Sequence, residues 1–311
     1  MSLAIAAIAA IVPVFNRPRV VVEALESIAA QTMPPACLIV VDDGSTDDTA
    51  NVVEQWMAGR EWPFATRLIR QANQGAAVAR NRGAAEAAGC ELLAYLDSDD
   101  LWPADYLQRM GDLFARHPEA VATSCDRVNL DLATDEVDPH SYANYGRGDR
   151  NVTTIIFMDG PPGTPNTVFR ATAFHELGGY DARWPTGQDY DLMLRLSLRG
   201  RWLHVPGASV TTRNHTELKT GGGEPPLSLK YSDRVFRRAQ LLHAFIHEHG
   251  GAVAVPEKLW RARLGQLWFR AGRKLLELDR RAEARDCFRR AVEARPWHLP
   301  ARWRLLTLRR E

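Results

Sequence analysis

Cysteine is scarce in this chain of 311 residues, and its four cysteines do not occur in pairs. They are Cys37, Cys90, Cys125 and Cys287, so the CxxC spacing of a typical zinc site is missing. The same scatter gives no disulfide framework of the kind on which small secreted domains depend. We therefore expect reduced and mostly buried thiols, as in cytosolic proteins.

Long hydrophobic runs are also absent. No stretch reaches the ~20 apolar residues that a membrane-spanning helix needs, so the sequence predicts no such helix. The first apolar run, residues 3–15, could pass for the core of a signal peptide, but no basic segment precedes it and it leads directly into a turn. We expect this run to form the first buried strand of a soluble, cytoplasmic protein.

Net charge is nearly absent as well, at a formal value of +1, but the two signs are unevenly distributed. Residues 231–311 contain 19 Lys and Arg against 9 Asp and Glu, which leaves 20 against 29 in residues 1–230. A basic tail can bind anionic lipid, an acidic glycan, nucleic acid or a partner protein, although a solvated helix surface is commoner. We expect no nucleic-acid partner here.

The composition, 45% hydrophobic and 25% charged, is that of a globular protein long enough for two domains. Between residues 8 and 100, short apolar runs alternate with helical stretches. The runs lie at 8–15, 37–41, 65–69 and 91–96, and the helical stretches at 18–31, 46–58 and 74–88. This βαβαβαβ order predicts an α/β fold with a mostly parallel, Rossmann-like sheet flanked by helices.

The pattern changes further along the chain. A helix is expected after Pro103, followed by a strand at 120–125 within a mixed region. A Gly-Gly-Gly-Glu-Pro-Pro break at 221–226 then precedes a helical pattern that continues to the last residue. We predict one α/β domain over residues 1–222 and a small, basic, all-helical region over 223–311.

The segment YLDSDDLW at 95–102 is the most informative motif. An apolar run delivers Asp97, Asp99 and Asp100 to the end of a predicted strand, where open α/β sheets bind ligands. Carboxylate oxygens are hard ligands that suit Mg²⁺ or Mn²⁺. The alternative is an ordinary loop in which Asp and Ser form a turn and cap the next helix.

Two other predicted strand ends carry polar residues. PVFNRP at 13–18 ends the first strand, and its simplest interpretation is a strand-to-helix turn with Asn16 as cap. VVDDGSTDDT at 40–49 ends the second strand, where Asp42 and Asp43 could satisfy backbone amides of the turn. Acidic residues therefore follow two predicted strands, at 42–43 and at 97–100. Two such strand ends are harder to explain as turn formers alone.

Together with NQGAAVARNRGAAEAAGCELLAYLDSDD at 73–100, these segments resemble the family 2 glycosyltransferases of bacteria, which are inverting sugar-nucleotide enzymes with the GT-A fold. The resemblance covers residues 6–215 and rests on the order of PVFN, DDGS, NQG-ARN-G, DSDD-W and a late Gln-Asp step. It implies transfer of a sugar, by default from a UDP-sugar, to a hydroxyl of a glycan, a lipid-linked saccharide or a protein, with Mn²⁺ or Mg²⁺ as cofactor.

The resemblance also implies a nucleotide pocket at the first two strand ends. The backbone around Pro13 and Val14 would flank the base, and Asn16 would line the pocket. Asp43, with Asp42 beside it, would accept a hydrogen bond from the imide N–H of the base. A carboxylate suits that donor.

Near the diphosphate, the resemblance implies a basic residue and the DXD motif. Arg80 takes the first role, with a surface salt bridge as its alternative. Asp97 would reach the ribose and stand close to the metal, Asp99 would hold the metal, and Asp100 could share either task. The metal would neutralise the charge that develops as the nucleoside diphosphate departs.

The segment GGYDARWPTGQDYDLMLRL at 178–196 contains the implied general base, Asp189. Relatives usually show an acidic residue before this base, whereas this chain has Gln188. A neutral amide does not destabilise the carboxylate by charge repulsion, so activation would rest on partial desolvation and hydrogen bonding to substrate. The alternative is that Asp189 is a helix N-cap, with Asp191 supporting the first turn.

Four further residues are weaker candidates. Arg213 and His215 lie where many relatives place a basic residue and a His near the diphosphate or metal, although an isolated His is more often structural. Trp102 and Trp184 could stack on sugar rings, but single aromatics are more often core or rim residues.

The basic tail allows two interpretations. Residues 282–306 resemble a tetratricopeptide repeat, but one such unit cannot bury its own faces, so a packed appendage or a homodimer contact is expected rather than a scaffold. Alternatively, four tryptophans among Arg and Lys fit a helix that lies on the inner face of a membrane; they are Trp260, Trp268, Trp297 and Trp303. We favour packing, with peripheral membrane contact as a secondary effect.

Two rival functions remain open. A nucleotidyltransferase would use the same Asp-held metal, but it normally needs a Gly-rich basic loop after the first strand, and PVFNRP has no glycine. A non-catalytic module for sugar nucleotides or glycans would bind donor without turnover and act through the basic tail. Asp189 and an intact DSDD segment favour the enzyme over this module.

Overall fold

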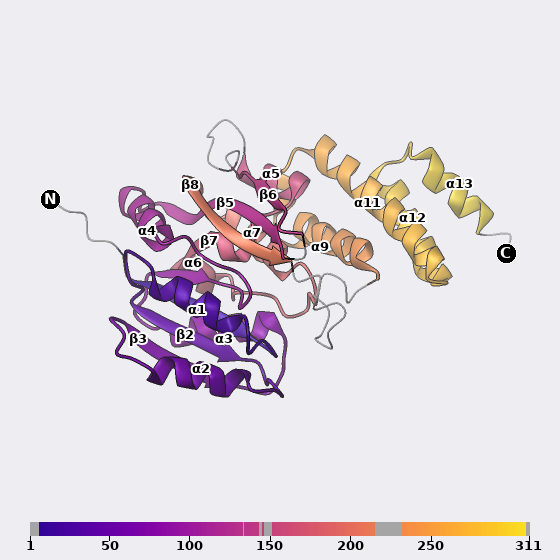
Figure 1. Cartoon of the computed structure of the whole chain (residues 1–311). Coiled ribbons are helices and arrows are strands. Elements are labelled where there is room, and N and C mark those ends of the chain that lie inside the picture. Colours follow the sequence, from indigo (N-terminus) through magenta and orange to yellow (C-terminus); the bar gives the residue numbers. More distant parts are fainter. Residues whose placement is uncertain (1–5, 133, 143–144, 146–150, 215–231, 309–311) are drawn as a thin grey trace. The chain divides into compact units, whose positions relative to one another are not determined.

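The computed structural model describes residues 6–132, 134–142, 145, 151–214 and 232–308. The chain forms two compact units (Figure 1). The first comprises Met1–Val152, Pro162–Ala182 and Arg199–Glu224, and the second comprises Thr153–Pro161, Arg183–Leu198 and Pro225–Glu311. The domain boundary expected at 222/223 lies outside the described residues and stays a prediction.

Within the described part of the first unit, eight strands form one mixed sheet. The order is β3-β2-β1-β4-β7-β5-β6, and β8 pairs with β5. The strands are β1 (Ile8–Val14), β2 (Cys37–Asp42), β3 (Ala65–Arg70), β4 (Leu92–Tyr95), β5 (Ala120–Asp131), β6 (Val137–His140), β7 (Thr167–Arg170) and β8 (Arg201–Asn214). β1 to β4 run parallel, whereas β7 is antiparallel to both β4 and β5. With β2 on one side of β1 and β4 on the other, the topology reverses at β1.

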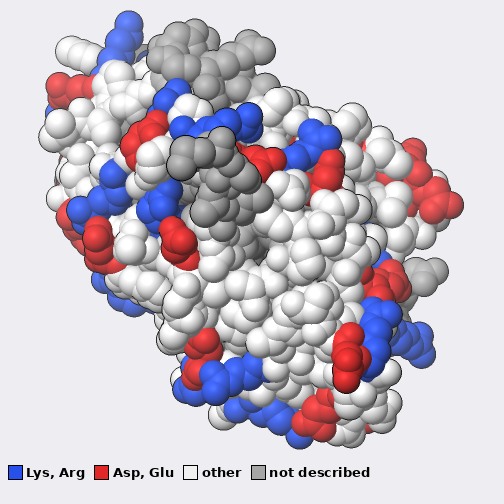
Figure 2. All heavy atoms as spheres, turned by 90° about the vertical axis from the view of Figure 1, so that its left-hand side faces the viewer, with Lys and Arg blue, Asp and Glu red and all other residues white. Residues whose placement is uncertain are grey.

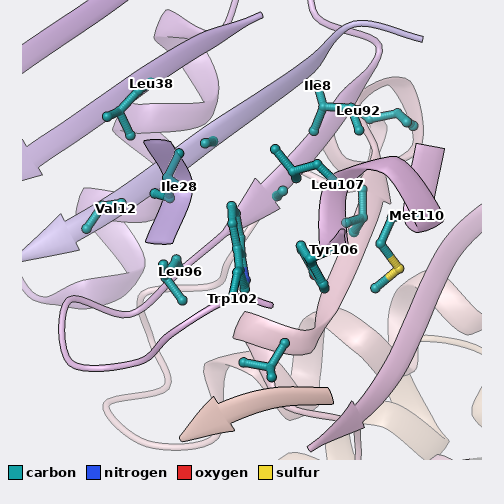
Figure 3. Close-up of a cluster of buried hydrophobic side chains, with 14 of the residues drawn as sticks. Ile8, Val12, Ile28, Leu38, Leu92, Leu96, Trp102, Tyr106, Leu107 and Met110 are labelled. Atoms are coloured by element: carbon teal, nitrogen blue, oxygen red, sulfur yellow. The ribbon is translucent and has the colours of Figure 1, made fainter. Parts of the chain in front are cut away.

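Helices pack on both faces of the parallel strands. They are α1 (Val21–Ala29), α2 (Thr49–Ala58) and α4 (Tyr106–Arg116) on one face, and α3 (Ala76–Glu86) on the other. Val12 of β1 lies in a core cluster with Ile28 of α1 and Met110 of α4 (Figure 3). The neighbouring Ile11 lies against α3 on the other face. Because both faces are covered, β1 is buried along its whole length. This explains why its sequence is a continuous apolar run.

Helix α3 approaches the sheet closely at Gly83. A Cβ atom at this position would lie 2.4 Å from Cγ2 of Ile11. We expect Gly83→Ala to destabilise the protein by roughly 1–3 kcal/mol, because an added methyl group overpacks this contact. Thermal unfolding would measure the change. The matched control is Gly59→Ala at the end of α2. Gly59 has a φ of −70°, and a Cβ atom there would lie 3.3 Å from the nearest atom. An unchanged melting temperature for Gly83→Ala would contradict this packing.

The fold class expected from the sequence is confirmed, and each strand and helix expected before residue 100 is present within a few residues of its expected range. The strand β8 was not predicted. Its 14 residues contain Pro206 and Gly207, which resemble a turn in the sequence. The structure accommodates them in an irregularity of the β5–β8 register, after the pair Cys125↔Val205 and before Asp126↔Ser209.

The second unit is helical within its described residues. It contains α7 (Gln188–Ser197), α9 (Arg234–Glu248), α10 (Gly251–Ala254), α11 (Glu257–Glu277), α12 (Arg281–Ala294) and α13 (Leu299–Thr307), together with most of α5 (Val152–Asp159). Trp268 of α11 and Phe288 of α12 are among its largest fully buried side chains. The helices expected after residue 224 are therefore present where the structure describes the chain.

The tetratricopeptide resemblance of residues 282–306 stays a hypothesis. These residues form α12 and α13, which contact each other, and Ala284, Phe288 and Ala301 are buried.

Of the described helices, none is both long and apolar enough to cross a bilayer.

Charges of both signs are interspersed on the face of the molecule shown in Figure 2. Several basic side chains of the first unit pair with acids, as in Arg60–Glu26 at 2.8 Å and Arg201–Glu119 at 3.0 Å. The acidic excess of residues 1–230 therefore does not produce a purely acidic surface there.

A histidine gives the second unit a predicted pH dependence. The pKa of His243 is lowered from 6.5 to about 4, mainly by burial and also by the neighbouring His247 and Arg290, against an opposing effect of Glu248. Because His243 binds a proton more readily in the unfolded chain than in the folded one, its effect on the free energy of unfolding depends on pH. The free energy of unfolding is retained above about pH 6.5 and decreases as the pH falls towards 4. We expect the unfolding temperature to fall across this window, and to fall less in His243→Gln. An equal pH slope in His243→Gln and in the exposed control His140→Gln would contradict this assignment.

Candidate active site

The carboxyl ends of β1, β2 and β4 lie at one edge of the sheet. Pairing between β1 and β4 ends at Ile11↔Tyr95, and Leu96 donates a final hydrogen bond to the Ile11 carbonyl at 3.0 Å. Pro13 lies just beyond this point, where its missing N–H leaves no ladder bond unmade. The two strands therefore stop pairing at the topological switch point, which is where open α/β sheets bind ligands.

Asn16 connects the first two strand ends. It has a positive φ of 50°, and its backbone N–H donates to Oγ of Ser45 at 2.9 Å. Its side-chain oxygen accepts from the backbone N–H of Thr46 at 2.9 Å. The side chain predicted to line a nucleotide pocket thus also holds the loop after β1 against the loop after β2.

Asp42 and Asp43 are both buried at the end of β2. Oδ1 of Asp43 accepts from the Gln71 side chain at 2.8 Å and from the Gln74 backbone at 2.9 Å, and Oδ2 accepts from the Gly75 N–H at 2.7 Å. Asp42 accepts from the backbone N–H of its own turn, at Ser45. The Asp43 carboxylate therefore fixes the loop that leads into α3, a role that sequence reasoning did not identify.

Arg80 and Asp97 form the central ion pair of this edge. Nη2 of Arg80 lies 2.6 Å from Oδ1 of Asp97. The Arg80 side chain is largely buried and its guanidinium lies 5.4 Å from the ring centroid of Tyr180, whereas part of the Asp97 side chain is exposed. The pair thus holds a positive and a negative group at the end of β4, with the carboxylate accessible to solvent.

A second contact positions this pair and was missed from the sequence. The Asn81 side chain donates to the Tyr180 carbonyl and accepts from the Tyr180 N–H, both at 2.8 Å. Tyr180 in turn packs edge-on against Tyr95, two residues before Asp97. Asn81 therefore ties the loop after α6 (Ala171–Glu176) to α3. The ARN triplet in the sequence was the available signal, but Tyr180 lies 99 residues away.

The other two acidic residues of the DSDD segment differ in environment. Asp100 is buried and accepts from the Arg213 N–H at 3.1 Å. Burial raises the pKa of Asp100 well above its usual value, the carboxylates of Asp97 and Asp99 raise it further, and Arg213 opposes them. The environment of Asp100 thus disfavours ionisation more than that of an exposed carboxyl group would. Asp99, in contrast, is only partly buried.

The end of β8 is hydrogen-bonded to residues 99–101, at the end of the DSDD segment. Leu101 and Thr211 exchange backbone hydrogen bonds at 2.9 and 3.0 Å. Arg213 donates through Nε to the Asp99 carbonyl and pairs through Nη1 with Glu23 of α1. Arg213 was predicted near a diphosphate, and its described contacts hold the acidic loop in place. His215 lies outside the described residues.

The oxygen donors at this edge fit a divalent cation such as Mg²⁺ or Mn²⁺. Within the described residues, no group of three or more His, Cys, Asp or Glu side chains is arranged to hold a metal alone. This is compatible with Mg²⁺, which is commonly bound through one or two carboxylates together with substrate phosphates. Asp97 and Asp99 are the carboxylates that such an ion would use.

Trp102 lies in the core rather than on a sugar-binding surface. Its ring stacks on Tyr106 with centroids 4.6 Å apart (Figure 3). Its indole N–H donates to the Pro165 carbonyl at 2.8 Å. The core alternative considered for this residue therefore describes it. The structure gives Trp102 the role of anchoring the start of α4.

In the second unit, Asp189 is the second residue of α7. Gly187 is the N-cap, so Asp189 is not the cap, and Oδ1 of Asp189 accepts from the Tyr190 N–H at 2.9 Å. A carboxylate in the first turn interacts favourably with the helix dipole, which stabilises its ionised form. Gln188 is buried and Trp184 is partly buried.

Several side-chain contacts hold α7, the helix that carries Asp189. Asp191 and Arg195 form a buried ion pair one helical turn apart, with Nε to Oδ2 at 2.8 Å. The hydroxyl of Tyr190 donates to the Phe157 carbonyl at 2.8 Å, and Arg238 lies over the Tyr190 ring. These contacts fix α7 within its unit, and sequence reasoning identified none of them.

Residues 9–178 match the family model described as glycosyl transferase family 2. The match covers more than half of the chain, so the chain belongs to glycosyl transferase family 2. The family that the motifs suggested is therefore confirmed.

Curated relatives agree in class. An uncharacterized glycosyltransferase of Nostoc sp. is 39% identical over 107 residues, which cover 34% of this chain and 32% of that protein. One of Haemophilus influenzae is 28% identical over 193 residues, covering 60% of each chain. Chondroitin synthase of Escherichia coli is 25% identical over 195 residues, covering 62% of this chain and 27% of the synthase. The chain thus spans less than two thirds of the length of these relatives.

Solved structures show the same fold. Residues 1–349 of S. aureus TarS in complex with UDP-GlcNAc give a TM-score of 0.65 at 16% identity, covering 93% of this chain and 81% of that one. The mannosyltransferase PcManGT from Pyrobaculum calidifontis in complex with GDP-Man and Mn²⁺ gives 0.55 at 21% identity, covering 97% and 79%.

Proposed function

We propose that this protein is a metal-dependent inverting glycosyltransferase that moves a sugar from a nucleotide-sugar donor, by default a UDP-sugar, to an acceptor hydroxyl. The observation that carries the proposal is the Arg80–Asp97 pair beside Asp99, at the carboxyl end of β4 and next to the switch point. Membership of glycosyl transferase family 2 supports it. The fold neighbours bind UDP-GlcNAc in one case and GDP-Man with Mn²⁺ in the other.

The donor would bind along the edge formed by β1, β2 and β4. The backbone of Pro13 and Val14, with Asn16, would flank the base. Asp43 would accept the base N–H through Oδ2, which has one described partner and retains a lone-pair position. Asp42 would keep the turn in shape.

The diphosphate would lie near Arg80, whose fixed charge stabilises the leaving group. A bound Mn²⁺ or Mg²⁺ would supply Lewis-acid chemistry there, held by Asp99 and Asp97, with His215 as a further candidate ligand. Asp97 would also reach the ribose, whereas Asp100, held by Arg213, would support the loop.

Asp189 would act as the general base. Its carboxylate takes the proton of the acceptor hydroxyl, the hydroxyl oxygen bonds to the anomeric carbon, and the bond from that carbon to the diphosphate oxygen breaks. Attack opposite the leaving group inverts the anomeric configuration. Gln188 and Trp184 would contact the sugar or the acceptor, which would be a glycan, a lipid-linked saccharide or a protein.

Donor turnover tests this function. The purified protein is incubated with UDP-, GDP- and dTDP-sugars in the presence of Mn²⁺ or EDTA, and released nucleoside diphosphate is measured. Metal-dependent release from one donor is the expected result. Donor binding without release, with or without added acceptors, would favour a non-catalytic binding module.

A further inference from the structure

The helix α13 exposes a hydrophobic surface that the proposed reaction does not use. Large apolar side chains of α13 (Leu299–Thr307), and Trp297 just before it, are unusually exposed; the exposed fractions are 82% for Trp297, 69% for Leu299, 58% for Trp303 and 62% for Leu306. Leu299, Trp303 and Leu306 are spaced four and three residues apart, so they share one face of the helix. We call these four residues the α13 surface.

The α13 surface is not explained by a loosely attached helix. Ala301, on another face of α13, is fully buried, and α13 contacts α12. His298 accepts a hydrogen bond from the Ala301 N–H at 3.2 Å and thereby caps the helix, and its ring lies 4.8 Å from that of Phe269 of α11. The helix is therefore packed on one side and exposes tryptophan and leucine on the other.

Basic side chains accompany the α13 surface. A hollow of about 430 Å³ is lined by Phe269, Arg273, Leu299, Pro300, Trp303 and Arg304. The Arg304 guanidinium lies 5.1 Å from the Trp303 ring centroid. Residues 294–308 contain three arginines and no Asp or Glu. Every Lys, Arg, Asp or Glu in α13 and in the segment just before it is therefore an arginine, and so positively charged.

The positive charge around the α13 surface indicates which kind of partner binds it. A symmetric contact with a second copy would bring the same acid-free, arginine-bearing face against itself, and like charges across an interface are unfavourable. An anionic bilayer surface offers the complement: phosphate groups for the arginines and an interfacial region in which Trp and Leu are stable. We propose that the α13 surface docks onto an anionic membrane surface, independently of the proposed glycosyl transfer.

Vesicle sedimentation with the full-length protein tests this inference. The probes are vesicles of phosphatidylcholine alone and of phosphatidylcholine mixed with phosphatidylglycerol, at low and high salt. We expect binding to the anionic vesicles that weakens with salt. The double variant Trp303→Ser with Leu306→Ser, and separately Arg273→Gln with Arg304→Gln, should each lower the partition coefficient by about tenfold or more.

The control is Val253→Ser, which removes an apolar side chain that is 96% exposed in the same unit. Val253→Ser should bind vesicles as the unsubstituted protein does. All variants should have the circular dichroism spectrum and the donor turnover of the unsubstituted protein. Equal binding to both vesicle types, or unchanged binding of both double variants, would overturn the inference. So would sedimentation showing a dimer that Trp303→Ser with Leu306→Ser dissociates, which would assign the face to a second copy.

Discussion

Replacing Asp189 by Asn should lower the rate of glycosyl transfer by about 10²–10⁴-fold, the usual contribution of a general base. The carboxylate lies in the first turn of α7, next to a buried amide rather than a second acid. Asn keeps the shape and the position but cannot accept the acceptor proton. Because the donor contacts proposed for the first unit are untouched, the affinity for the nucleotide sugar should change little. Single-turnover kinetics and donor titration separate the two effects.

The matched control is Asp279→Asn, the same substitution at a side chain that is 94% exposed in the same unit. Its positive φ of 56° is tolerated by Asn as well as by Asp. It should leave transfer unchanged. If Asp189→Asn retained full activity while folding normally, Asp189 would not be the base.

Replacing Arg80 by Met should reduce kcat/KM for the donor by about 10²–10³-fold, because a fixed positive group at the leaving diphosphate is lost. The same change removes the partner of Asp97, 2.6 Å away. We therefore expect the concentration of Mn²⁺ required for half-maximal activity to change as well. Methionine preserves most of the aliphatic packing against Tyr180.

Arg82→Met is the control for Arg80→Met because it lies on the same helix. The Arg82 side chain is 53% exposed and pairs with Glu86. Activity within about twofold of the unsubstituted protein is expected, since exposed ion pairs contribute little. Equal losses in the two variants would indicate a general effect on α3 rather than a role for Arg80 at the diphosphate.

Much of the first half of the fold could be predicted because its signals are local. β1 and β2 are covered on both faces, so their residues are apolar up to Asp42 at the end of β2, and the crossover helices follow at regular spacing. β8 was missed because Pro206 and Gly207 interrupt its pattern, and its irregular pairing with β5 compensates for them. That compensation depends on a partner strand about 80 residues away, which a local pattern does not contain.

The site shows the same division. The strand ends at Asp43 and Asp97 were identifiable because topology alone brings them to one edge of the sheet. The groups that fix these carboxylates were not: Gly75 holds Asp43, and Asn81 acts through Tyr180. Such partners are ordinary polar residues in the sequence, and only tertiary structure gives them a function.

The stereochemistry of donor hydrolysis is the most direct test of single displacement. Proton NMR of the active donor with Mn²⁺ and water as acceptor would follow the first sugar released. The proposed mechanism predicts that this sugar has the anomeric configuration opposite to that of the donor, and that nucleoside diphosphate appears in equal amount. Retention of configuration would contradict single displacement, and release of nucleoside monophosphate would show that the bond broken is at phosphorus instead.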